Sequence, residues 1–325
     1  MYDVKRSVDE LVKELSNLLP KLFGRKLSPR ASALLPQELY GKAEELLLLQ
    51  KKAEGMRFKD LTKVEAIWLL EQIDKGVHLL IDDVPAEQRG LDWLLERLHA
   101  LIAPIAGISY LSETSYQEYR DSLFDLAHTI CKYSLEQGDQ LTDFLNDVDQ
   151  DLDASVAMGQ MFMTRLMKDY RFLDGELGRS TSATMRRYTR IYGDLSGYFE
   201  KSIRVIVGLL DILDGMKPDY RKIKRTTLAA NVGRVRKSAY AILSGMIDTT
   251  IRNAIAHKSD YFDPVKKTVE FPNLTQARSF SCQEFLCQTR ELSALVLALT
   301  QFRLILSFDQ LSLFKLILEK LETEP

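Results

Sequence analysis

The sequence predicts an all-helical fold, a multi-helix bundle with a second, N-terminal helical domain. Apolar residues recur every three or four positions through most of the 325 residues, which is the period of an amphipathic helix. No proline occurs from 105 to 217, and this favours long, uninterrupted helices. Residues 266–271 are the one strand-like run, so we expect at most one short β-ribbon.

A domain boundary is expected near 104–114, where Pro104 and Gly107 interrupt the helical period. Before it, Thr62 and Glu65 have the spacing of a capping box, which predicts the start of a helix. The N-terminal domain, residues 1–110, is expected to contain helices at 39–54, 62–74 and 90–103.

Residues 111–325 form the second predicted helical domain, whose core is expected at about 180–325. Capping-box patterns begin at Ser115 and at Ser281, and the turn pair Asp263–Pro264 precedes the predicted ribbon. The helices expected in this domain lie near 115–136, 139–173, 180–214, 232–257, 281–306 and 308–322.

The composition favours a soluble protein of a reducing compartment. Three cysteines are too few and too scattered for a disulfide framework. The N-terminal residues lack the apolar core of a signal peptide. The apolar stretch 292–308 is broken by Gln301 and Arg303, so we expect no membrane span and a cytoplasmic location. Glycine-rich phosphate loops and close-spaced metal-ligand motifs are absent from the sequence, so we expect neither a cofactor nor a metal.

The formal net charge of -2 conceals an uneven distribution of charge. Residues 1–150 carry 18 basic and 26 acidic side chains, whereas residues 151–325 carry 26 basic and 20 acidic ones. A basic half is suited to bind a polyanion such as RNA, although two solvated surfaces of different charge give the same pattern.

The most informative cluster of polar residues lies at the end of the predicted helix 232–257. Asn253 and His257 are four positions apart, and Arg252 precedes Asn253, so these three side chains are expected on one polar side of the last turns. Asp248 lies four positions before Arg252 and is expected to pair with it. A second stripe at helical spacing is expected to face the core: Tyr240, Leu243, Ile247, Ile251 and Ala254.

These residue types suit RNA cleavage without a metal. Such a reaction needs a base for the ribose 2′-hydroxyl, an acid for the leaving oxygen and a cation for the phosphorane. Histidine can take either proton-transfer role and arginine can clamp phosphate oxygens. A two-fold dimer would bring together two such helix ends. The alternative is a charged helix end, with Arg252 paired to Asp248 and His257 next to the helix C-terminus.

The string TIRNAIAHKSDYFDPVKKTVEF, followed by the capped apolar helix SCQEFLCQTRELSALVLALTQF, resembles the HEPN superfamily (higher eukaryotes and prokaryotes nucleotide-binding domains), in its Abi-type and Apea-like branches. The resemblance covers about 240–306. It implies a helical bundle that acts as a homodimeric, metal-independent endoribonuclease, a toxin or an abortive-infection effector in phage defence. It also implies that Arg252 and His257 are catalytic and that Asn253 orients them or the phosphate. We add Asp248 as a supporting residue behind Arg252.

A basic segment between Lys217 and Lys237 leads into this motif and is the expected RNA-binding surface. Tyr220 and Tyr240 are placed to stack on bases at either end. A solvated surface without a ligand remains the alternative. The RNA-binding candidates are Arg221, Lys222, Lys224, Arg225, Arg234, Arg236 and Lys237.

The sequence therefore predicts a HEPN-type ribonuclease that cleaves RNA into fragments with a 2′,3′-cyclic phosphate and a 5′-hydroxyl. The N-terminal domain is expected to bind a trigger or inhibitor protein, or to restrain the nuclease. The alternative is a non-catalytic helical dimerisation module that binds nucleotide, RNA or a protein partner.

Overall fold

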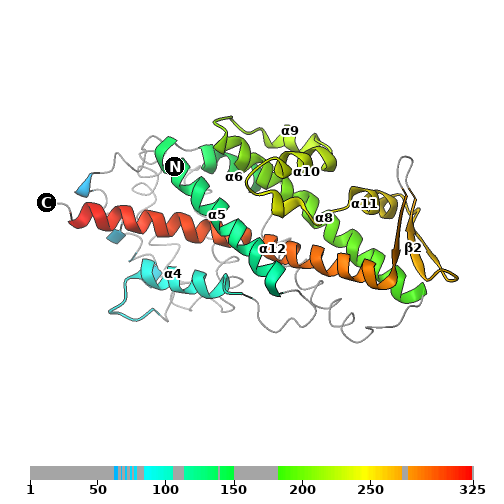
Figure 1. Ribbon diagram of the computed structural model, residues 1–325. Coiled ribbons are helices and arrows are strands. Elements are labelled where there is room, and N and C mark those ends of the chain that lie inside the picture. The colour runs from blue at the N-terminus through cyan, green and yellow to red at the C-terminus, as the bar shows by residue number, and fades with distance from the viewer. Residues whose placement is uncertain are drawn as a thin grey trace, which may run out of the picture. The chain divides into compact units, whose positions relative to one another are not determined.

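The computed structural model describes residues 84–104, 113–137, 140–149, 182–272 and 277–323, together with scattered positions between 62 and 78 (Figure 1). These residues are mostly helical, as predicted. The predicted helix 39–54 lies outside the described residues, and of the helix 62–74 only scattered positions are described. The chain divides into two compact units, residues 1–101 with 310–325, and residues 102–309. The first unit ends at 101, before the predicted end of the N-terminal domain at 110, and it also includes residues 310–325, which were predicted in the second domain.

In the first unit, α4 (Gly90–Leu101) matches the helix predicted at 90–103. It has Leu91, Trp93 and Leu98 on its buried side. Gly90 begins this helix, and its backbone N–H donates to the Asp74 side chain. The Arg97 guanidinium lies 5.1 Å from the centroid of the Trp93 ring, one turn away.

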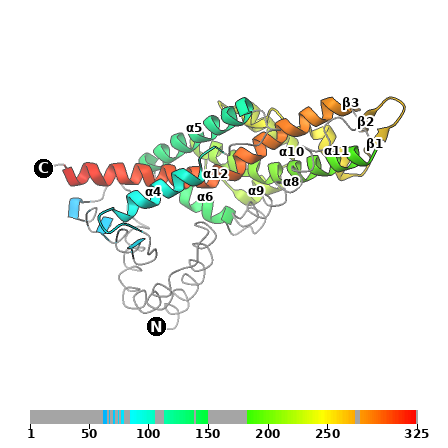
Figure 2. The ribbon, with the colours of Figure 1, turned by 90° about the horizontal axis from the view of Figure 1, so that it is seen from below.

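Three long helices form the core of the second unit: α5 (Glu113–Gln137), α8 (Ser182–Leu213) and the first part of α12 (Cys282–Thr323). The predictions at 115–136 and 180–214 are confirmed, although α5 begins before the Ser115 capping pattern. Of the predicted helix 139–173, the structure describes α6 (Gln140–Asp149). Figures 1 and 2 show α8 packed with α12, and Tyr192 meets Phe285 there at a ring-centroid distance of 5.6 Å.

The predicted continuous helix at 232–257 is wrong. The segment contains the end of α10 (Leu228–Arg236), the 3-10 turn η2 (Ala241–Ser244) and the short helix α11 (Thr249–Ala256). Local side-chain bonds cause the breaks. The Ser238 hydroxyl donates to the Val235 carbonyl at 2.8 Å and accepts from the Tyr240 N–H at 3.1 Å, and this tightens the chain into a turn.

The apolar stripe predicted along this segment is nevertheless buried. Each of its members is at most 7% exposed, and Leu243 and Ile251 are fully covered. The three short elements therefore present one continuous apolar side to the core even though the backbone changes direction between them.

The two predicted helices at 281–306 and 308–322 are a single helix, α12. Residues 282–323 contain neither glycine nor proline, so no residue in them breaks the helix. The capping box at its start is confirmed, because the Ser281 N–H donates to Glu284 at 2.8 Å and the Glu284 N–H donates to the Ser281 hydroxyl at 3.2 Å.

Within the described residues, α12 is the one helix long and apolar enough to span a membrane. However, 67% of its most apolar window is buried inside the protein. A core helix of a soluble protein has the same properties, so its composition does not identify a membrane segment.

A small sheet lies at the end of the second unit, beside α11 (Figures 1 and 2). It has three antiparallel strands in the order β1 (Tyr261–Asp263), β2 (Thr268–Phe271) and β3 (Arg278–Ser281), whereas we expected at most one ribbon. The outer strands have three and four residues, too few for a clear alternating pattern. Phe271 anchors the sheet to α12 through Phe285, at 5.1 Å between centroids.

Candidate functional site

The helix α11, which carries the Arg-Asn-x3-His motif, is fixed against α8 along its length. Ile251 and Ala254 are the buried side of α11, which packs against α8 and β2. Gly193 of α8 faces Ile255 so closely that a β-carbon there would lie 3.0 Å from the Ile255 side chain. A small residue at this point lets the two helices approach.

Asp248 caps the start of α11. Its side chain accepts from the N–H groups of Thr250 and Ile251, at 2.8 Å and 3.3 Å. It also pairs with Arg278 of β3 at 3.1 Å. The predicted Asp248–Arg252 pair is wrong, because a capping residue has extended backbone (φ -98°, ψ 110°) and its side chain turns back toward the helix end.

A buried tyrosine supports the same helix end. The Asp248 backbone N–H donates to the Tyr192 hydroxyl of α8 at 3.1 Å. Burial raises the pKa of Tyr192 well above its ordinary value, so the phenol stays neutral. Nothing in the sequence around Tyr192 indicates this role, because Asp248 lies 56 residues away along the chain.

Arg252 is held by a carboxylate that the sequence did not indicate. Its Nη2 lies 2.6 Å from Oε2 of Glu200 in α8, and its Nη1 donates to Oδ1 of Asn253 at 3.2 Å. The Arg252 side chain remains 32% exposed. The other Glu200 oxygen accepts from Arg204 at 2.8 Å, so one carboxylate joins two guanidinium groups.

His257 lies at the exposed C-terminal end of α11. The next residue, Lys258, adopts the left-handed conformation (φ 54°), which is rare outside glycine. The Ser259 N–H then bonds to the Ala254 carbonyl and the Lys258 N–H to the Ile255 carbonyl, at 2.9 Å and 3.0 Å. This is a Schellman motif, and it ends the helix directly after His257.

The structure thus brings Arg252 and Asn253 into direct contact and places His257 one turn beyond Asn253 on the same short helix. Asp248 lies at the opposite end of that helix. No contact between the His257 imidazole and the other two side chains is present in the described part of the chain.

The basic segment forms α9 (Tyr220–Arg225) and α10, which follow each other along α8 before η2 and α11 (Figure 1). Arg234 is 31% exposed, less than the other candidates, and it pairs with Asp214 and lies 3.5 Å from Asp211 at the end of α8. Lys222 is 84% exposed beside Asp219. The remaining candidates are exposed: Arg221, Lys224, Arg225, Arg236 and Lys237.

The prediction that Tyr220 and Tyr240 stack on bases is wrong, because both rings are buried. Tyr220 packs edge-on against Phe144, at 6.1 Å between centroids. The Tyr240 hydroxyl donates to Asp125 of α5 at 3.0 Å. Tyr220 lies on the same side of α9 as the buried Ile223, and Tyr240 belongs to the buried apolar stripe, so both rings face the core, where an aromatic side chain buries a large apolar surface.

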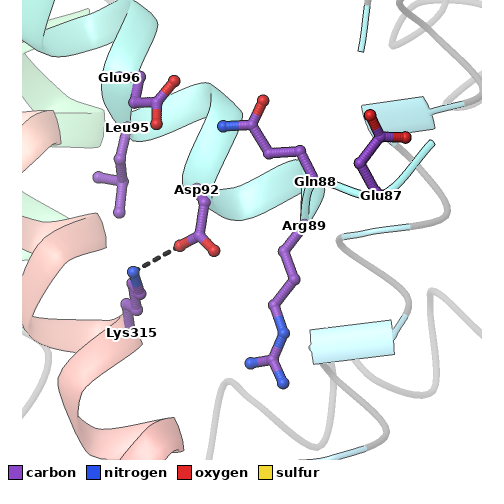
Figure 3. Close-up of a pocket in the computed structure, with 7 residues that line it drawn as sticks. All are labelled: Glu87, Gln88, Arg89, Asp92, Leu95, Glu96 and Lys315. Carbon is purple, nitrogen blue, oxygen red and sulfur yellow. Dashed lines mark ion pairs between the residues drawn. The ribbon is translucent and has the colours of Figure 1, made fainter. Parts of the chain in front are cut away.

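A separate cavity of about 550 Å³ lies in the first unit, between the start of α4 and the end of α12 (Figure 3). Its centre is an ion pair of Asp92 with Lys315 at 2.5 Å, and the hydrogen bond that Lys315 donates to Asp92 raises the pKa of Lys315. The pairing neutralises Asp92 and Lys315, and the remaining charged side chains of the lining are Glu87, Arg89 and Glu96. It is lined by Glu87, Gln88, Arg89, Asp92, Leu95, Glu96 and Lys315.

Comparison with protein-family models, curated proteins and solved structures gives no match for this chain. Across the described residues, no group of three or more His, Cys, Asp or Glu side chains is arranged to hold a metal ion. The sequence analysis missed Glu200 and Arg204. Their four-residue spacing is a common helix pair, and only the fold brings them to Arg252.

Proposed function

We propose that this protein is a HEPN-type, metal-independent endoribonuclease with its site at the end of α11. The observation that supports this most directly is the arrangement of three polar residues on one short, firmly anchored helix. Arg252 is partly exposed and oriented by Asn253, and His257 is exposed at the helix terminus. A polyanion can therefore reach both a fixed cation and an imidazole.

In the proposed reaction, the 2′-hydroxyl attacks the adjacent phosphorus and the 5′-oxygen leaves, which gives a 2′,3′-cyclic phosphate and a 5′-hydroxyl end. His257 moves the proton at one of these oxygens, and Arg252 binds the phosphate oxygens on which charge develops. One protomer supplies one imidazole, and a base and an acid are both needed. A two-fold homodimer would contribute the second His257 and a second Arg252.

The basic segment supports an approach path for RNA. The Arg234 contact at Asp211 lies about three turns further along α8 than the Arg252 contact at Glu200, about 16 Å along the axis. The helices α9 and α10, which carry the exposed basic side chains, pack against α8, and so does the motif helix α11. Their field favours the approach of phosphate groups.

The biological role that fits such an enzyme is a cytoplasmic toxin or phage-defence effector. Residues 1–110 would then bind a trigger or inhibitor protein or restrain the nuclease. This part of the proposal follows from the resemblance and from the presence of a separate first unit.

One observation favours the alternative of a non-catalytic dimerisation or binding module. Arg252 forms an ion pair with Glu200 at 2.6 Å within a single chain. A structural arginine that joins α11 to α8 would have this same contact and would need no substrate.

RNA cleavage by the purified full chain in excess EDTA tests the proposal. Wild type is expected to cut mixed tRNA and mRNA and to leave cyclic phosphate ends. His257→Ala and Arg252→Ala are each expected to lose at least about a hundredfold in rate, the contribution typical of one proton-transfer group or one oxyanion donor.

The matched control is His128→Ala, which removes another accessible imidazole, 59% exposed and 3.4 Å from Asp309. It is expected to cleave like wild type. Cleavage that survives in both motif variants would mean that the activity comes from elsewhere. Absence of cleavage by wild type would favour the non-catalytic module.

A further inference from the structure

Glu200 occupies an unusual position between two arginines. Its Oε2 contacts Arg252 Nη2 at 2.6 Å and its Oε1 contacts Arg204 Nη2 at 2.8 Å. Its side chain is only 17% exposed, compared with 32% for Arg252. Because one negative charge faces two positive charges, the cluster keeps a formal charge of +1.

The Arg252 guanidinium is held on two sides and open on a third. Its contacts to Glu200 and to Asn253 use two of its five N–H donors within the described part of the chain. Three donors therefore remain for the oxygen atoms of a ligand. A guanidinium already fixed in orientation can bind phosphate without first losing side-chain freedom.

The scaffold behind Glu200 is rigid. Gly193 lies two helical turns before Glu200 on α8, and the close approach of Gly193 to Ile255 sets the distance between α8 and α11. Asp248 and Tyr192 fix the start of α11 on the same helix. The backbones that carry Glu200 and Arg252 are therefore held close together.

We propose that Glu200 is the positioning residue of the ribonuclease site, which orients the Arg252 guanidinium toward the scissile phosphate. This inference rests on the proposed ribonuclease function. Arg204 donates to the other carboxylate oxygen of Glu200, so Glu200, Arg204 and Arg252 together keep a formal charge of +1. Glu200 does not touch the substrate and acts only through Arg252.

The test is steady-state cleavage of a short RNA by the full chain in EDTA. Glu200→Gln keeps the shape of the side chain but removes its charge. We expect kcat to fall at least about tenfold with KM within about threefold of wild type, because binding of the polyanion is retained while the cation loses its orientation. Glu118→Gln is the matched control. It makes the same chemical change at an exposed position of α5 and is expected to keep kcat within about threefold.

Each outcome is decisive. A Glu200→Gln kcat equal to or above that of wild type would overturn the positioning role and leave the ribonuclease proposal intact. A rise in KM at constant kcat would assign Glu200 to binding and also overturn it. No cleavage by wild type would overturn both proposals.

A second variant, Glu200→Asp, tests the proposal if Glu200→Gln does not fold. It keeps the charge but withdraws the carboxylate by one methylene, so we expect kcat to fall at least about threefold at constant KM. An unchanged kcat would contradict the proposal.

Discussion

Single polar side chains determine where the helices around the candidate site begin. Asp219, Thr227 and Asp248 each accept a backbone N–H at the start of α9, α10 and α11. Asp and Thr are residue types that favour helix caps. The sequence alone, however, also allows Asp248 inside a helix, four residues before Arg252, where it would pair with that arginine. The choice between the two depends on where the backbone turns, and the tertiary contact with Tyr192 contributes to that.

The cap at the start of α12 predicts a pH dependence of stability. The Ser281 N–H and hydroxyl lower the pKa of Glu284 below its ordinary 4.5. A lowered pKa means that the ionised carboxylate stabilises the folded state. This contribution is present above the unfolded pKa and is lost as the pH falls through the folded one. We therefore expect Glu284→Gln to be less stable than wild type at about pH 7 and equal to it at about pH 3.

Urea unfolding of both proteins at the two pH values checks this expectation. All other acidic groups are shared, so the difference between the two midpoints isolates Glu284. A difference that stays constant with pH would contradict a role for its charge.

Among the elements, the long helices were predictable and the short ones were not. The helices α5 and α8 have an unbroken three-to-four period, and their limits were found within a few residues. From 232 to 257 the apolar residues keep the same period across two breaks in the backbone. The buried side chains of α10, η2 and α11 are spaced along the sequence as they would be in one continuous helix. Periodicity reports which side chains are buried, and it does not report the backbone turns at Ser238 and Asp248.

The contact between α6 and α8 depends on a glycine. A β-carbon at Gly208 would overlap the buried Phe144 ring, so Gly208→Ala forces that ring to move. Overpacking of this kind costs about 1–3 kcal/mol, which exceeds the gain of up to about 1 kcal/mol in helix propensity. We expect a net loss of about 1–2 kcal/mol in unfolding free energy, measured by urea denaturation.

Gly197→Ala in the same helix is the matched control. It is exposed and has no neighbouring atom within 4 Å of an added β-carbon. It should therefore gain about 0.5–1 kcal/mol from helix propensity alone. Equal stabilisation by both substitutions would show that Phe144 does not fill the space beside Gly208.

At the scale of the whole molecule, the candidate site combines residues that are distant in the sequence. Arg252, Asn253 and His257 were found from their spacing and from the pattern that follows them. Glu200 was not, since it lies 52 residues from Arg252 and pairs locally with Arg204. Linear spacing reveals partners within one helix, whereas partners across two helices follow only from the packing of α8 against α11.

The proposed reaction requires more groups than one copy of the motif contains, which leads to a test of the assembly. In a composite dimeric site, removal of the motif from one protomer leaves one imidazole where a base and an acid are both needed. Co-expression of wild type with the double variant Arg252→Ala/His257→Ala under different tags, followed by purification on both tags, isolates that heterodimer. We expect it to lose at least about a hundredfold in rate relative to the wild-type homodimer, because one proton-transfer group and one cation are missing from the shared site. If each protomer instead contains a complete site, the heterodimer keeps one intact site and about half of the wild-type rate. That result would remove the dimeric site from the proposal while leaving Arg252 and His257 as its catalytic residues.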